Sequence, residues 1–278
     1  MNKNLNYEFF NKGFFKINNL ISKKKLNIVK NEIFDFANLF AKKINNFKFK
    51  KKILSLNDFS DFCINLESYN PKYFFHFVTL VSKLNSMLDL VNSISKSKLL
   101  NITSSILNEK KSNLLTSYPP SFLVNLPKNK RVLYHWHTAK SGYPKRVSYV
   151  NFWVPLLVEK KINNGSLKVA VKSHFNEDYP YKEFRDTDRF GKNALTQMLV
   201  PKSYVNKFVI KTLKGKVGSC YGMHRNLLHS SSLNKSNQCS YVLIFKIWSI
   251  SKDLTLSSNI QQKLSEIDDG SCGEILSI

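Results

Sequence analysis

The spacing of apolar residues changes near Pro119-Pro120, and this change limits most strongly what the chain can fold into. Before it, apolar residues recur at spacings of three and four, which indicates amphipathic helices. After it, short segments of period-two alternation are separated by turns such as Asn163-Asn164-Gly165, which indicates β-strands. The order predicts an α+β fold: an antiparallel double-sheet (jelly-roll) barrel with a helical N-terminal half packed on it.

The first half contains the predicted helices. Residues 7–21 predict a short helix followed by a strand. Ser22 has the side chain and the position of an N-cap for a helix that reaches about Lys43. A lysine-rich loop is expected near residues 42–52, and the apolar stripe from residue 74 to about 107 predicts a further helix.

The second half contains the predicted strands, which are residues 121–125, 132–137, 148–157, 167–171, 207–212, 218–223 and 240–250. The polar residues 173–204 predict a long excursion, and such loops often act as binding lids. We expect a single domain over residues 1–278, with a mainly helical part (1–118), a jelly-roll core (119–250) and a peripheral tail (251–278).

Charge and cysteine content narrow the class of protein. The net charge of +24 suggests a nucleic-acid partner, but the lysines are spread over the chain. We therefore expect weak polyanion attraction and no specific nucleic-acid partner. No apolar run reaches the roughly 18–20 residues of a membrane span. Four cysteines without a CxxC pair favour a reduced, cytoplasmic setting.

Two segments carry the candidate metal ligands. One is Tyr134-His135-Trp136-His137-Thr138-Ala139, and the other contains His229. His135 and His137 have the same parity, so on a regular strand both would face one metal together with His229. Three imidazoles bind iron, zinc or copper. The alternative is that residues 134–137 form an aromatic barrel strand whose histidines are ordinary polar side chains and bind no metal.

Several segments, taken in order, resemble the phytanoyl-CoA dioxygenase-like family of non-haem iron, 2-oxoglutarate-dependent oxygenases. They are Phe9 to Ser22, Trp136 to Ala139, Phe152 to Leu156, Asn164 to His174 and Gly218 to Ser236. The resemblance covers roughly residues 7 to 250. It implies Fe(II) and 2-oxoglutarate as cofactors of an active protein, with a small-molecule substrate that is hydroxylated.

The resemblance also implies the ligands. His137 would be the first metal ligand and His229 the distal one. The family's carboxylate would stand at the position of Ala139, so the triad is degenerate there. The family's arginine for the far carboxylate of 2-oxoglutarate would stand at the position of Ser240.

Replacements for the two missing groups are open at this stage. Arg225 or Arg131 could take over the role of the arginine. The carboxylate could come from the excursion, whose acidic residues are Glu177, Asp178, Glu183, Asp186 and Asp188, although solvated loop charges are the simpler interpretation.

Four interpretations therefore remain. The first is an altered but working oxygenase, whose lysine-rich surface suits an anionic or sugar-linked substrate. In the second, Ala139 opens a position for a halide, as in relatives that halogenate their substrates. The third is a catalytically inactive relative, without cofactors, that serves as a binding or scaffold module. The fourth is a basic polyanion-binding protein.

Overall fold

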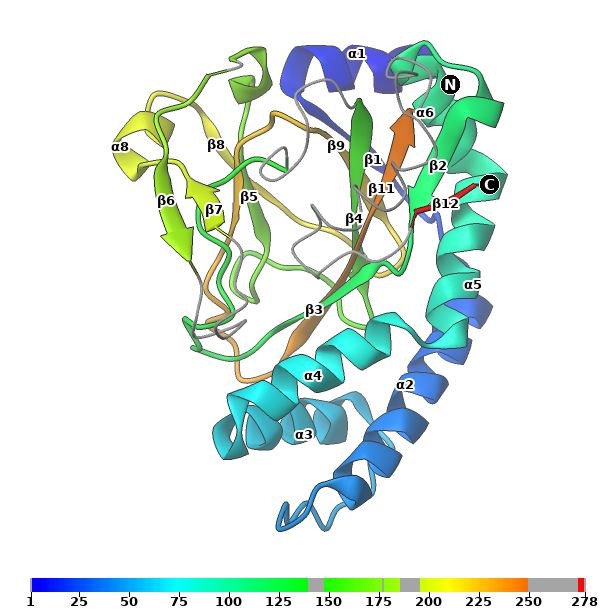
Figure 1. Cartoon of the computed structure of the whole chain (residues 1–278), viewed down its shortest axis with the longest axis vertical. Helices are drawn as coiled ribbons and strands as arrows, with labels where there is room; N and C mark the ends of the chain where they lie inside the picture. The colour runs from blue at the N-terminus through cyan, green and yellow to red at the C-terminus, as the bar shows by residue number, and fades with distance from the viewer. Residues whose placement is uncertain (1, 140–147, 177, 186–195, 250–274, 278) are drawn as a thin grey trace.

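The structure is a computed structural model that describes residues 2–139, 148–176, 178–185, 196–249 and 275–277. Most of the helices lie along one side and one end of the strands, and the N-terminal helix lies across the other end (Figure 1). The fold is the α+β jelly roll expected from the sequence, with antiparallel sheets and a helical N-terminal half packed on them.

The helical layer agrees in part with the predicted helices. It consists of α1 (Asn2–Lys12), α2 (Lys23–Lys43), α3 (Leu56–Tyr69), α4 (Pro71–Ser82), α5 (Asn85–Ile94), the π-helical turn η1 (Ser95–Leu99) and α6 (Leu100–Leu107). The N-cap of α2 is Ser22, whose side chain accepts a hydrogen bond from the Lys25 amide at 3.4 Å. The single helix predicted from residue 74 is wrong, because Leu84 is extended (φ −64°, ψ 142°) and separates α4 from α5.

Within the described ranges, no helix is by itself both long and apolar enough to cross a membrane. Helix α4 and the helical stretch from Asn85 to Leu107 meet that test only together, across a bend of 50°.

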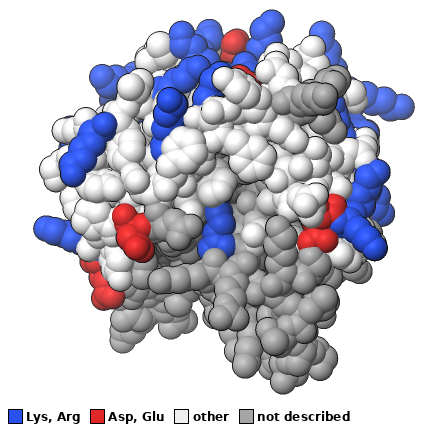
Figure 2. Space-filling model, turned by 90° about the horizontal axis from the view of Figure 1, so that it is seen from above, with Lys and Arg blue, Asp and Glu red and all other residues white. Residues whose placement is uncertain are grey.

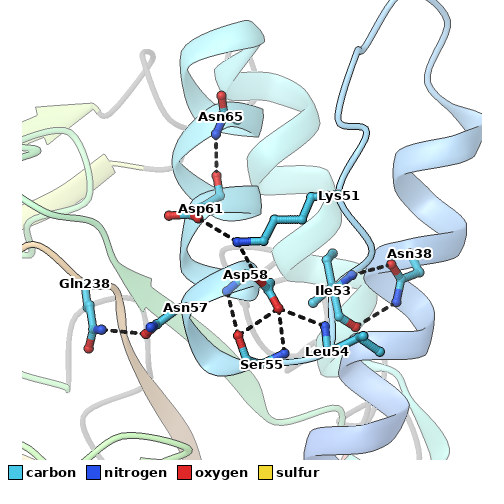
Figure 3. Close-up of polar contacts among 10 residues, drawn as sticks. All are labelled: Asn38, Lys51, Ile53, Leu54, Ser55, Asn57, Asp58, Asp61, Asn65 and Gln238. Atoms are coloured by element: carbon cyan, nitrogen blue, oxygen red, sulfur yellow. Dashed lines mark hydrogen bonds and ion pairs between the residues drawn. The ribbon is translucent and has the colours of Figure 1, made fainter.

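Helix α3, which the sequence did not predict, is held by polar contacts at its first turn (Figure 3). Ser55 accepts from the Asp58 amide at 3.2 Å, and the Asp58 carboxylate accepts from the Ser55 amide at 2.9 Å. This is a capping box. Lys51 forms ion pairs with Asp58 and Asp61, so one lysine of the predicted solvated loop is tied to the helix.

The strands form three antiparallel sheets, and their bounds are β1 (Phe14–Ile17), β2 (Leu114–Ser117), β3 (Ser121–Asn125), β4 (Tyr149–Leu156), β5 (Leu167–Ala170), β6 (Lys182–Arg185), β7 (Thr196–Leu199), β8 (Ile210–Leu213), β9 (Cys220–His224), β10 (His229–Ser231), β11 (Ser240–Ser249) and β12 (Ile275–Ser277). The main sheet has the order β1-β9-β4-β11-β2-β12, and β3 also pairs with β11. The second sheet has the order β10-β5-β8, and β6 pairs with β7.

One strand prediction is wrong: residues 132–137 form no regular strand, and His137 alone makes an isolated bridge there. Strand β12, near the end of the chain, pairs with β2 at the edge of the main sheet. A short helix, α8 (Lys202–Val205), lies within the predicted excursion.

Strand β11 separates two hydrophobic clusters. Tyr241 and Leu243 belong to the large cluster shared with the helices. Val242 belongs to a smaller cluster inside the barrel, together with Trp153 of β4 and Tyr221 of β9. Because successive side chains on a strand point to opposite faces, the even-numbered residues of β11 face the barrel interior. Ser240 and Lys246 therefore face inward.

Candidate metal centre

His137 and His229 are direct backbone neighbours. Each amide donates to the carbonyl of the other residue, and both hydrogen bonds are 3.0 Å long. Opposed residues of an antiparallel pair place their side chains on the same face. The ring centroids are accordingly 4.3 Å apart. The fold thus brings together two of the three imidazoles considered from the sequence.

Both rings are oriented by the backbone in the same way. The Nδ1 atom of His137 lies 2.6 Å from the carbonyl oxygen of His135, and that of His229 lies 2.8 Å from the carbonyl oxygen of Leu227. A carbonyl oxygen only accepts, so each Nδ1 carries the proton and each Nε2 keeps its lone pair. Histidines that ligate metals are fixed in this way by an outer hydrogen bond.

His229 is held in its neutral form. Burial is the main cause that lowers its pKa to about 3, and the neighbouring His137 acts in the same direction. The bond to the Leu227 carbonyl opposes this shift, and the positive charge of Lys246 adds a smaller lowering effect. A neutral imidazole is the form that binds a metal.

His135 is not part of the pair. Its side chain is exposed, since the segment that was expected to be a regular strand has no strand geometry and the parity argument does not apply. Throughout the described ranges, no three His, Cys, Asp or Glu side chains are grouped so that they could hold a metal ion.

Ala139 lies beside the aromatic rings of Tyr149 and Trp248, and its carbonyl accepts a hydrogen bond from the Tyr149 hydroxyl. Of the acidic residues considered as replacements for its missing carboxylate, Asp178 and Glu183 are exposed. Glu177, Asp186 and Asp188 lie outside the described residues.

The two candidate arginines lie in different environments. Arg131 forms an ion pair with Glu67 of α3 at 3.2 Å, and its side chain is largely exposed. Arg225 is buried, with its guanidinium carbon 5.4 Å from the centre of the Tyr149 ring. Of the two arginines, Arg225 is the one that lies against Tyr149, and the hydroxyl of Tyr149 donates to the carbonyl of Ala139, where the family's carboxylate is missing.

The sequence analysis missed Lys246. This lysine is buried on the inward face of β11, 5.6 Å from the Trp248 ring centre and 6.0 Å from that of Tyr149. In the sequence, a lysine within an otherwise apolar predicted strand could have indicated that this residue has a special role. Lys160, which is also buried, was missed as well, and no pattern in the sequence marks it.

A second pair of histidines packs where α1 meets β1. The rings of His174 and His224 have their centroids 5.1 Å apart, and His174 Nε2 lies 2.9 Å from the Phe10 carbonyl oxygen. The His174 ring occupies the space over Gly13, where a Cβ atom would come within 2.6 Å of it. These contacts give both rings a packing role.

A pocket of about 290 Å³ lies at the opposite end of β11 from Lys246. Its lining residues are Val158, Glu159, Lys161, Asn163, Asn164, Ser236, Gln238 and Cys239. None of them is a predicted site residue.

An antiparallel jelly roll with a helical N-terminal half packed on it is the architecture of a double-stranded β-helix protein. The particular group follows from the sequence: the model of the phytanoyl-CoA dioxygenase (PhyH) family matches residues 13–240, and the chain belongs to this family. No sequence among the curated proteins matches it significantly.

Solved structures share the fold. EvdO2 from Micromonospora carbonacea var. aurantiaca, complexed with 2-oxoglutarate, is 12% identical with a TM-score of 0.60, over 90% of this chain and 91% of that one. The carbocyclase SnoK from nogalamycin biosynthesis is 12% identical, with a TM-score of 0.55 over 92% and 91% of the two chains. The epimerase SnoN, complexed with Fe3+, alpha ketoglutarate and nogalamycin RO, is 11% identical with a TM-score of 0.53, over 89% and 83%.

The described residues fit the family's iron in part. Two imidazoles whose Nδ1 atoms are held by backbone carbonyls match iron as donors, whereas the carboxylate of the two-histidine, one-carboxylate triad has no counterpart at Ala139. Two neutral ligands leave the charge of a divalent metal uncompensated, and Lys246 adds positive charge nearby. An anion that binds beside the metal would offset this charge.

Proposed function

We propose that this protein is an Fe(II)- and 2-oxoglutarate-dependent oxygenase in which His137 and His229 alone supply the metal ligands from the described residues. The observation that carries the proposal is the hydrogen bond from each Nδ1 to a backbone carbonyl, which directs both Nε2 lone pairs away from the backbone. Membership of the family and the 2-oxoglutarate and iron in the titles of EvdO2 and SnoN support it.

In this proposal, residues of the chain have the following roles. His137 and His229 hold the metal, and the buried cations Arg225 and Lys246 attract an anionic cosubstrate or substrate to the barrel mouth. Iron bound there supplies oxidation of a substrate C–H bond, coupled to decarboxylation of the 2-oxo acid. The same cations favour a substrate that carries an anionic group, including a sugar-linked one.

Metal binding tests the proposal directly. Under anaerobic conditions, the wild-type protein is expected to bind one equivalent of Fe(II) in the presence of 2-oxoglutarate and to release succinate when oxygen is admitted. The variants His137→Ala and His229→Ala should lose both properties, because one imidazole cannot hold the ion alone. His76→Ala is the matched control, since His76 is exposed on α4. Failure of the wild-type protein to bind stoichiometric metal would refute the proposal.

A binding or scaffold module without catalysis is the second candidate function. The specific observation in its favour is that the described ranges contain no third metal ligand. The absence of both bound metal and succinate release would favour this candidate. Tighter binding of 2-oxoglutarate in the presence of chloride would instead favour a halide in the position left by Ala139.

A further inference from the structure

Large apolar side chains are exposed at one end of the barrel, where three segments of the chain meet. Phe10 on α1 is 51% exposed, Phe175 on the short helical turn η3 (Ser173–Phe175) is 63% exposed, and Val209 directly before β8 is 76% exposed. Ile210, the first residue of β8, is exposed beside Val209. Single apolar residues are ordinary on a protein surface, whereas a group of them marks an interaction site.

The three segments lie side by side because contacts join them. The Phe10 carbonyl oxygen lies 2.9 Å from Nε2 of His174, whose ring packs against the Phe175 ring with centroids 4.3 Å apart. The Val171 amide, which precedes η3, donates to the Val209 carbonyl at 2.9 Å. One surface, which we call the apolar end, is therefore made of Phe10, Phe175, Val209 and Ile210.

Lysines lie on the same segments. Lys172 is exposed directly before η3, and its amide donates to the carbonyl of Lys12 on α1 at 3.2 Å. Lys211 on β8 is exposed as well. The acidic residues nearby are Glu8, which pairs with Lys12 at 2.9 Å, and the exposed Asp178. Figure 2 looks onto the end of the molecule where α1 lies, and lysine and arginine side chains border uncharged surface there.

We propose that the apolar end binds the surface of an anionic lipid bilayer, with its apolar side chains among the headgroups and its lysines against the lipid phosphates. Apolar insertion and attraction between lysines and anionic lipids together hold a protein at a membrane surface. A second copy of the chain fits less well, because two chains of net charge +24 repel each other. A nucleic acid also fits less well, since the aliphatic Val209 and Ile210 offer no ring on which a base could stack.

Cosedimentation with lipid vesicles tests the apolar contribution. The wild-type protein is expected to bind vesicles that contain phosphatidylserine at least about tenfold more tightly than vesicles of pure phosphatidylcholine. The double variant F175S/V209S should lose at least about tenfold in affinity for the anionic vesicles, because two large side chains no longer insert. Leu54→Ser is the matched control, since Leu54 is 70% exposed just before α3, at the opposite end of the molecule from α1 (Figure 1).

A pair of charge variants tests the contribution of the lysines. K172Q/K211Q should weaken binding to the anionic vesicles by roughly tenfold or more, because each lysine near such a surface contributes about fivefold. K161Q/K235Q removes the same net charge from two exposed lysines in the loops between β4 and β5 and before β11, and should weaken binding clearly less.

Several results would overturn the inference. One is wild-type protein that does not bind the anionic vesicles, and another is binding that F175S/V209S leaves unchanged. Equal losses in F175S/V209S and Leu54→Ser would show that the effect does not belong to the apolar end. Self-association in light scattering, or binding to a single-stranded oligonucleotide, that only F175S/V209S abolishes would assign the surface to a second copy or to a nucleic acid instead.

Discussion

Single residues carry the chemistry of this protein, and their environments differ sharply. His229 is buried yet paired with His137, and its neutral form suits a metal ligand. Lys160 is buried without an anionic partner in the described chain, so its environment favours the uncharged amine. A buried residue that lowers the stability of the folded protein, without an evident structural role, is expected to have a functional role.

The buried Lys160 predicts a pH dependence of stability. Burial lowers its pKa from 10.5 to about 7, against a smaller opposing effect of the Cys239 thiol. Between these values the unfolded chain binds one more proton than the folded protein, so stability rises with pH across this window. Each unit of pKa corresponds to about 1.4 kcal/mol, and the full rise is on the order of a few kcal/mol.

Urea denaturation near the two ends of this window measures the effect. Lys160→Met should raise the free energy of unfolding most at the lower pH and flatten the profile, whereas Lys161→Met should retain the wild-type slope. If the Lys160→Met substitution instead destabilised the protein at both pH values, the lysine would have a structural role and the expected penalty would be absent.

At the scale of elements, capping and tertiary packing decided where helices begin and end. The sequence predicted α2 because its apolar stripe and its N-cap Ser22 coincide. Helix α3 was missed although its capping box is complete. The break between α4 and α5 was missed because Ser82 accepts a hydrogen bond from the Phe122 amide of β3, a contact that no local pattern indicates.

The two serine caps predict unequal contributions to stability. Ser55→Ala removes the side-chain arm of a capping box, at 3.2 Å from the Asp58 amide, and also the hydrogen bond of 2.7 Å from its hydroxyl to the Asp58 carboxylate, and should cost roughly 1–2 kcal/mol. Ser22→Ala removes a single bond of 3.4 Å and should cost clearly less. Chemical denaturation of both variants gives the comparison; equal losses would contradict the ranking.

At the scale of the whole molecule, the net charge of +24 is distributed. Figure 2 shows lysine and arginine side chains scattered over the face seen from above, with few acidic ones among them. A scattered charge attracts polyanions without a defined binding stripe.

Nucleic-acid binding by this protein should accordingly be weak and electrostatic. Its affinity for a short duplex is expected to fall steeply, by roughly 10³-fold or more, between low and physiological salt and to be the same for unrelated sequences. Fluorescence anisotropy with two duplexes over a salt series measures both properties. A sequence preference that persists at physiological salt would revive a specific nucleic-acid role.

The sequence by itself determined the class of fold and the two histidines that carry the proposed site, because hydrophobic period and ordered motifs are local properties. It could not determine that His135 turns outward, since that depends on an irregular segment whose backbone is bonded to residues distant in the sequence, at Tyr134, Trp136 and His137. Nor could it place Lys160 against Ser240 or Lys246 near His229. The members of each pair are far apart along the chain, and only the closing of the barrel brings them together.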